Sequence, residues 1–204
     1  IMNSFDKHPQ ADVVYSDFRC FRENSKNTFD PGYKRPNTSG YIFEDLVRNG
    51  NFIACGSFIV KKQPLEKTGL FDSRDFIKDW YFLLCLSYQK NYFLYLNAVL
   101  FLVRKRKGSQ SSDKTALTQR KINTLIELHK TCNDNDVINL IAFKILLTNL
   151  RLGFMMLQKG LLINSFKYFL RTMQFILKVN LYTLTTESVT TFKELFHTAT
   201  NVHE

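Results

Sequence analysis

The sequence changes character at residues 107–113, K-G-S-Q-S-S-D, which are small or polar. Before this segment, short apolar runs alternate with loops that contain Pro and Gly, which is typical of strands and turns. After it, apolar residues recur at helical spacing. Strands followed by helices indicate a sheet-containing domain with a helical appendage. We therefore predict an α/β domain over residues 1–107, a linker at 108–114 and an all-α helical tail over 115–204.

The first part of the chain contains the signals for a small set of alternating strands and helices. Ser39 is expected to cap the helix predicted at 41–48, because a serine oxygen can accept hydrogen bonds from unpaired amides at a helix start. The helix predicted at 79–90 is apolar on nearly all sides, which indicates that it is buried. We predict strands at 12–18 and 57–61, one or two strands at 92–104, helices at 41–48 and 79–90, a loop at 23–38 and a turn at 63–69.

The helical tail contains breaks near residue 133 and at Gly160. Asp136 is expected to cap the second tail helix. The third has one apolar face and a basic stripe that includes Lys167 and Arg171. No run reaches about 18 uninterrupted apolar residues, so no membrane-spanning helix is predicted. We predict tail helices at 115–131, 135–158, 162–180 and 187–198.

One segment of the tail carries a strong excess of positive charge. The formal net charge is +10, and residues 137–186 contain six basic residues and no acid. Such a bias favours a polyanionic neighbour. Nucleic acid is not expected, because no recognised binding motif is present and the basic residues are dispersed among aliphatic ones. Peripheral attachment to an anionic membrane surface is one prediction, and a helical bundle with a basic solvent face is the alternative.

The four cysteines, Cys20, Cys55, Cys85 and Cys132, are widely spaced and include no Cys-x-x-Cys pair. This spacing predicts neither a zinc site nor a disulfide framework. Free thiols are typical of a reducing compartment. We therefore predict a cytoplasmic protein, with the inner membrane face as the site of any peripheral attachment.

Asp79 is the carboxylate at the N-terminus of the apolar helix predicted at 79–90. Residues 80–112 contain no other acid, but include Lys90 and four consecutive basic residues at 104–107. A lone carboxylate in these surroundings is either a helix cap or a proton acceptor. A position near a helix N-terminus keeps it ionised, which both roles require.

Four further stretches flank Asp79 in the sequence. Upstream, N-F-I-A-C-G-S-F-I-V at 51–60 joins small residues to a strand, and G-L-F-D at 69–72 forms a turn. Downstream, Y-L-N-A-V-L at 95–100 is followed by V-R-K-R at 103–106. Each stretch is weak alone, and their order and spacing carry the information.

This arrangement resembles the acceptor-side half of the catalytic domain of family 2 glycosyltransferases, which have the GT-A fold. The resemblance covers about residues 10–112. It implies an inverting enzyme that transfers a sugar from a nucleotide-sugar donor to a hydroxyl of a saccharide or lipid-linked acceptor. In such an enzyme Asp79 would be the general base that takes the proton of that hydroxyl.

The resemblance also implies two groups of binding residues, and each group has a plainer structural alternative. The first group would line the acceptor pocket, or else form a tight packing point and part of the core. The second would face the donor diphosphate, or else be solvated. The acceptor group is Cys55, Gly56, Ser57 and Trp80, and the diphosphate group is Lys78, Arg104 and Arg106.

The Asp-x-Asp motif with which this family holds its metal and sugar diphosphate is absent. Asp12 and Asp17 do not replace it, because they are five residues apart on a predicted strand and should point to opposite faces. Since the first residue is Ile1, we expect a fragment of a larger enzyme that lacks the donor-binding half. The complete enzyme would use Mg or Mn; this fragment would bind no metal and be inactive alone.

Two departures from the family pattern leave a second hypothesis open. The family's Glu before the base is Lys78 here, and its metal-facing His is Arg106, which cannot ligate a cation. The alternative to an enzyme is therefore a degenerate, non-catalytic interaction module of the same fold.

Overall fold

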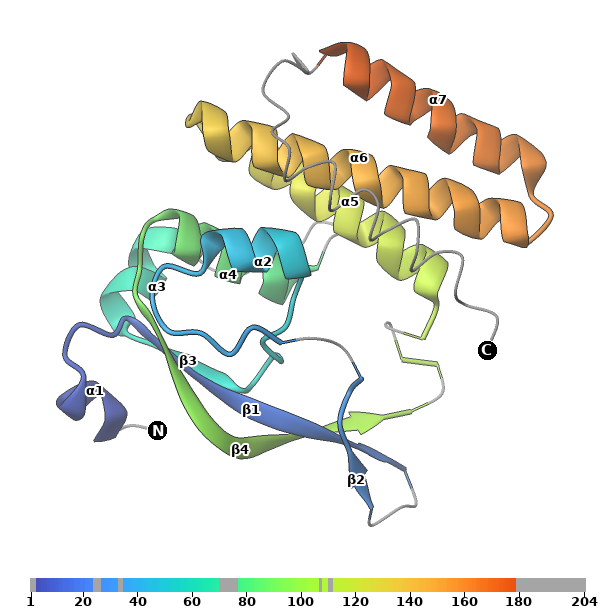
Figure 1. Cartoon of the computed structure of the whole chain (residues 1–204). Coiled ribbons are helices and arrows are strands. Elements are labelled where there is room, and N and C mark those ends of the chain that lie inside the picture. The colour runs from blue at the N-terminus through green and yellow to red at the C-terminus, as the bar shows by residue number, and fades with distance from the viewer. Residues whose placement is uncertain are drawn as a thin grey trace. The chain divides into compact units, whose positions relative to one another are not determined.

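The computed structural model describes residues 3–23, 27–32, 35–69, 77–106, 108–109 and 112–178. The chain divides into two compact units, Ile1–Leu117 and Thr118–Glu204 (Figure 1). The first unit contains a sheet and several helices, so the predicted α/β class is confirmed at this level. The described part of the second unit is helical. The predicted linker at 108–114 stays a prediction.

A four-stranded sheet with β1 as its common partner forms the framework of the first unit. β2 and β3 pair with β1 in antiparallel fashion, whereas β4 runs parallel to β1 along its length (Figure 1). The β1–β4 register shifts on both sides of Asp17. The strands are β1 (Val13–Arg22), β2 (Thr28–Phe29), β3 (Phe58–Val60) and β4 (Phe93–Lys105). Strands are confirmed in all three predicted ranges, where they are β1, β3 and a single strand β4. β2 lies in the predicted loop at 23–38.

The helices of the first unit supply much of its core. In α4, Leu83, Leu84 and Leu86 are fully buried, as the apolar pattern predicts. α2 and α4 are joined by a hydrogen bond from the Trp80 indole to the Leu46 carbonyl at 3.1 Å. The helices are α1 (Asn3–Lys7), α2 (Phe43–Asn49), α3 (Lys62–Thr68) and α4 (Lys78–Tyr88).

Two local predictions for this unit are wrong. The segment predicted as a turn at 63–69 is helix α3, which contains Pro64 in its first turn. Proline is tolerated there because the amide it lacks would have no partner within the helix. Ser39 does not cap α2: the N-cap residue is Ile42, which makes no side-chain cap bond. The Ser39 hydroxyl instead accepts from the Tyr95 amide of β4 at 2.9 Å.

Three helices make up the described part of the tail: α5 (Lys114–Thr131), α6 (Asn135–Gln158) and α7 (Leu162–Lys178). Their extents confirm the first three predicted tail helices closely. The cap of α6 is Asp134, which accepts from the Asp136 and Val137 amides, and not Asp136 as predicted. The predicted helix at 187–198 lies outside the described residues.

Helix α6 is long and apolar enough to cross a membrane, judged by length and composition alone. It has 24 residues, and its most apolar 18-residue window has a mean hydropathy of 1.7. Half of that window is buried within the protein, a property also found in core helices of soluble proteins. The search for uninterrupted apolar runs missed α6 because Lys144 and Asn149 interrupt it.

Candidate functional site

Asp79 is the second residue of α4 and is half-buried. The helix-cap alternative does not describe it, because the N-cap residue is Ile77. Its Oδ2 atom accepts a hydrogen bond from Nδ2 of Asn51 at 2.9 Å. Asp79 still lies in the first turn, where the helix dipole interacts favourably with negative charge. The structure therefore places an oriented carboxylate between solvent and core.

Asn51 and Cys55 come from the segment between α2 and β3 and lie beside Asp79. Partial burial and the negative charge of Asp79 raise the pKa of the Cys55 thiol above its ordinary value. The Oδ1 atom of Asn51 is buried and has no hydrogen-bond partner, which is an unusual cost in a folded protein. We call Asn51, Cys55 and Asp79 the Asp79 site. Sequence analysis missed Asn51, although it begins the small-residue stretch.

Gly56 and Ser57, predicted to line an acceptor pocket, are used for packing instead. A Cβ atom on Gly56 would lie 2.7 Å from Cζ of Phe101, so a side chain from β4 already occupies that space. Ser57 is 1% exposed, and its hydroxyl donates to the Ala54 carbonyl at 2.9 Å. The structural alternative, a tight packing point, therefore describes both residues. Cys55 and Gly56 are exposed, and of these two only Cys55 has a side chain that could contact a ligand.

Trp80 belongs to the core rather than to an acceptor pocket. Only 1% of the residue is exposed, and its single donor is satisfied by the Leu46 carbonyl. This burial leaves no ring face for a sugar, so the predicted stacking role is wrong. Burial follows from its position, because the indole reaches α2 and bonds to the backbone of that helix. The neighbouring Lys78 is exposed.

Arg104 and Arg106 lie at the end of β4 and are both exposed. Arg104 Nη1 lies 3.6 Å from Oε1 of Glu23, just beyond the end of β1. Such an exposed pair contributes about 0–1 kcal/mol and does not hold the guanidinium in place. Their predicted role toward a diphosphate stays a prediction. Of the basic run at 104–107, the last residue lies outside the described part of the chain.

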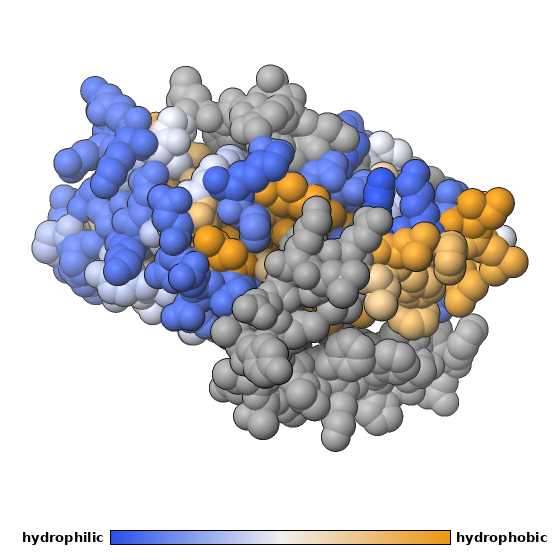
Figure 2. Space-filling model, turned by 90° about the horizontal axis from the view of Figure 1, so that it is seen from above, coloured by the Kyte–Doolittle hydropathy of each residue, from blue (hydrophilic) through white to orange (hydrophobic). Residues whose placement is uncertain are grey.

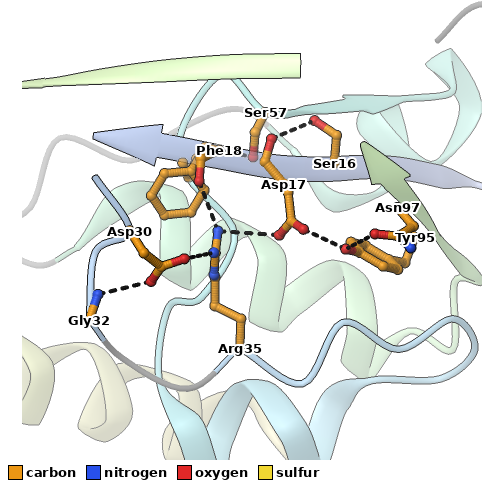
Figure 3. A network of polar contacts seen from close by, with 10 residues as sticks. Ser16, Asp17, Phe18, Asp30, Gly32, Arg35, Ser57, Tyr95 and Asn97 are labelled. Atoms are coloured by element: carbon orange, nitrogen blue, oxygen red, sulfur yellow. Dashed lines mark hydrogen bonds and ion pairs between the residues drawn. The ribbon is translucent and has the colours of Figure 1, made fainter. Parts of the chain in front are cut away.

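A second polar cluster, which sequence analysis missed, is built around Arg35 (Figure 3). Arg35 Nη1 lies 3.2 Å from Asp17 Oδ1 of β1, and Nη2 lies 2.7 Å from Asp30 Oδ2. Nη1 also donates to the Phe18 carbonyl at 3.0 Å, and the guanidinium lies over the Phe18 ring. Tyr95 of β4 donates to Asp17 Oδ2 at 2.6 Å. The sequence signal was an acid within an otherwise buried strand.

This Arg35 cluster joins β1, β4 and the loop between β2 and α2. Burial, and then the hydrogen bond and charge of Asp17, raise the pKa of Tyr95 to about 12. The guanidinium contacts two carboxylates, a carbonyl and a ring, so its charge and donors are largely satisfied. The Arg35 cluster stabilises the fold. The Asp79 site, by contrast, includes a buried oxygen without a hydrogen-bond partner, Oδ1 of Asn51.

No match to the chain was found among protein-family models, curated proteins or solved structures. The two sites must therefore be interpreted from their own chemistry. Over the described residues, no three His, Cys, Asp or Glu side chains come together in a group that could hold a metal ion.

Proposed function

We propose that this chain is the acceptor-side half of an inverting, family 2-like glycosyltransferase. The observation that carries the proposal is the Asp79 carboxylate, half-buried in the first turn of α4 and oriented by Asn51. Within the described part of the chain, the hydrogen bond that Asn51 donates to this carboxylate is accepted by Oδ2. We assign Oδ1 as the oxygen that would meet an acceptor hydroxyl. The GT-A assignment and the sugar-transfer reaction are both part of this proposal.

In the proposed reaction, the acceptor oxygen attacks the anomeric carbon of the donor sugar from the face opposite the nucleoside diphosphate. The new C–O bond forms as the bond to the diphosphate oxygen breaks, and the hydroxyl proton passes to Asp79 Oδ1. The first turn of α4 is a position where the helix dipole stabilises the negative charge of the base. Asn51 is a positioning residue that holds Oδ2 and so directs Oδ1 toward the acceptor.

The donor diphosphate carries negative charge that needs a counterion as it leaves. Arg104 and Arg106 are exposed cations at the end of β4 and are proposed to meet it. The Mg or Mn of the proposed complete enzyme would neutralise the same charge and would be held by its donor-binding half. Of the acceptor group only Cys55 remains a candidate to line the pocket, because Gly56, Ser57 and Trp80 are packed.

The test uses the full-length enzyme that contains this chain, with Asp79→Asn. Transfer is followed as nucleoside diphosphate release from UDP-, GDP- and dTDP-sugars in the presence of saccharide acceptors. We expect a loss of about 10²–10⁴-fold in turnover, with unchanged calorimetric binding of the nucleoside diphosphate. Asp136→Asn is the matched control, because it also removes an acid from the first turn of a helix. Wild-type turnover in Asp79→Asn would refute the assignment of the base.

The second candidate is a non-catalytic interaction module of the same fold. It is favoured by Lys78, which is exposed where the family has Glu, and by Arg106, which stands where the family has a metal-facing His. An intact Asp-x-Asp motif in the sequence preceding this chain would argue for the enzyme. Its absence, together with no turnover of any donor sugar, would favour the module.

A further inference from the structure

Helix α7 has its small polar residues inside and its large apolar residues outside. Its buried side chains within residues 162–173 are Ser165 and Thr172, at 2% and 3% exposed. On the outside, Ile163 is 86% and Phe166 is 63% exposed. A helix on the surface of a soluble domain normally shows the opposite pattern. The α7 apolar face, as we call this surface, consists of Leu162, Ile163, Phe166, Leu170 and Met173.

The orientation of α7 is set by close contact with α6. A Cβ atom on Gly153 of α6 would lie 2.9 Å from the Phe169 ring of α7, so the missing side chain admits that ring. Phe169 also packs edge-to-face on Phe154 at 5.4 Å between ring centroids. Ser165 and Thr172 are small enough to let the helices approach. Turning α7 to bury its apolar face would break these contacts.

Basic side chains border the α7 apolar face. Lys167 and Arg171 are exposed, one turn apart, and follow Phe166 and Leu170 directly in the sequence. Residues 137–186 contain no acid that could neutralise them. Figure 2 shows a hydrophobic area at its right-hand end, where Figure 1 places the turn between α6 and α7. The surface is therefore apolar in its middle and cationic along one border.

An anionic lipid surface fits this combination better than a second copy of the chain. In a two-fold dimer the same patch meets itself, which would bring Lys167 and Arg171 of both copies together without a facing acid. A bilayer with anionic headgroups supplies hydrocarbon for the apolar face and phosphate for the cations. Of these two occupants, the lipid surface is the one that satisfies both parts of the patch.

We propose that α7 lies in the interface of an anionic bilayer, with its apolar face at the acyl chains and Lys167 and Arg171 among the lipid phosphates. The proposal is independent of the Asp79 site, since it uses residues of the second unit alone. A transferase attached in this way would meet acceptors that are themselves membrane-bound.

The test measures co-sedimentation of the full 204-residue chain with vesicles of phosphatidylcholine, with and without phosphatidylglycerol. We expect binding to the anionic vesicles that weakens as salt is added. The double variant Lys167→Gln, Arg171→Gln should lower the partition coefficient by about 20- to 30-fold. Ile163→Ser with Phe166→Ser should lower it at least about tenfold. Lys62→Gln and Leu100→Ser, which change an exposed cation and an exposed apolar residue of the first unit, should leave it unchanged.

Three results would overturn the proposal. The first is equal binding to neutral and anionic vesicles, and the second is equal binding by the α7 variants and their controls. The third is no vesicle binding by a chain that instead dimerises with concentration and becomes monomeric in Ile163→Ser, which would assign the face to a second copy. Because the substituted side chains are exposed, the thermal midpoints of the variants should match that of the wild type, which separates binding from folding.

Discussion

Arg35 Nη1 lies 3.2 Å from Asp17 Oδ1, and only 12% and 16% of their side chains are exposed. The pair ties the loop before α2 to the central strand of the sheet. Tyr95 donates to the same carboxylate from β4 at 2.6 Å. This relationship explains how β1 carries an acid within a run of buried residues: the charge is balanced and its oxygens are hydrogen-bonded.

Removing the Arg35 guanidinium should therefore lower the stability of the fold. Arg35→Ala is expected to lower the free energy of unfolding by about 3 kcal/mol, because Asp17 would remain largely buried without its partner. Urea denaturation measures the change. Lys62→Ala is the control, since its ion pair with Glu66 is exposed and should contribute less than about 1 kcal/mol. Similar losses in both variants would contradict the assignment of stability to the Arg35 cluster.

The Tyr95 hydroxyl should make stability fall at alkaline pH. Its pKa is raised from 10.0 to about 12, by burial first and then by Asp17. The folded state thus holds this proton more tightly than the unfolded state, so its contribution is complete below pH 10 and is lost as the pH rises from 10 to 12. Tyr95→Phe should be less stable than wild type near neutrality and should lose less between these pH values. Parallel pH dependences of unfolding in the two proteins would contradict this.

The Cys55 thiol reports on Asp79 without any enzyme assay. Burial and the Asp79 charge raise the pKa of this thiol, so less thiolate is present at a given pH. Asp79→Asn should lower the pKa and speed alkylation of Cys55 by iodoacetamide near neutral pH. Peptide mass spectrometry separates Cys55 from Cys85, whose rate should not change. An unchanged Cys55 rate in Asp79→Asn would show that the two residues are not coupled.

Gly56 is required for two reasons, an unusual backbone angle and a close neighbour. Its φ is +97°, and an added Cβ would lie 2.7 Å from Phe101. Gly32 has φ +75° but open space around it, so Gly32→Ala measures the backbone cost alone, about 1–2 kcal/mol. Gly56→Ala should lose about 1–3 kcal/mol more, from overpacking. Phe101→Leu should restore part of this difference when combined with Gly56→Ala; equal losses at the two glycines would contradict the packing role.

Asp134 and Asp136 test the assignment of the α6 cap. Asp134 Oδ1 accepts from the Asp136 amide at 2.9 Å and from the Val137 amide at 3.3 Å. Asp134→Ala should cost about 1 kcal/mol in the free energy of unfolding. Asp136→Ala removes only an acid from the first turn and should cost less, about 0.3–1 kcal/mol at low salt. A larger loss in Asp136→Ala would reverse the assignment.

Much of the local structure could be predicted from the sequence, because its causes are near in the chain. The apolar pattern of residues 79–90 predicted a buried helix, and α4 is buried. Gly160 and the polar residues before 135 predicted where the tail helices end. Errors arose where neighbouring signals competed: Pro64 and Gly69 suggested a turn, but proline fits the first turn of a helix and glycine follows its end.

The candidate site depended on tertiary contacts that no local pattern contains. The sequence by itself determined the strand-then-helix order, the placement of Asp79 at a helix start and the cationic, acid-free stretch at residues 137–186 of the tail. Only the tertiary structure decided that the Phe101 ring occupies the space next to Gly56 and that Trp80 is buried in the core. The same is true of the hydrogen bond from Asn51 to Asp79. Helical and strand periods arise from residues a few positions apart, whereas burial and pairing here join side chains 28 or more positions apart.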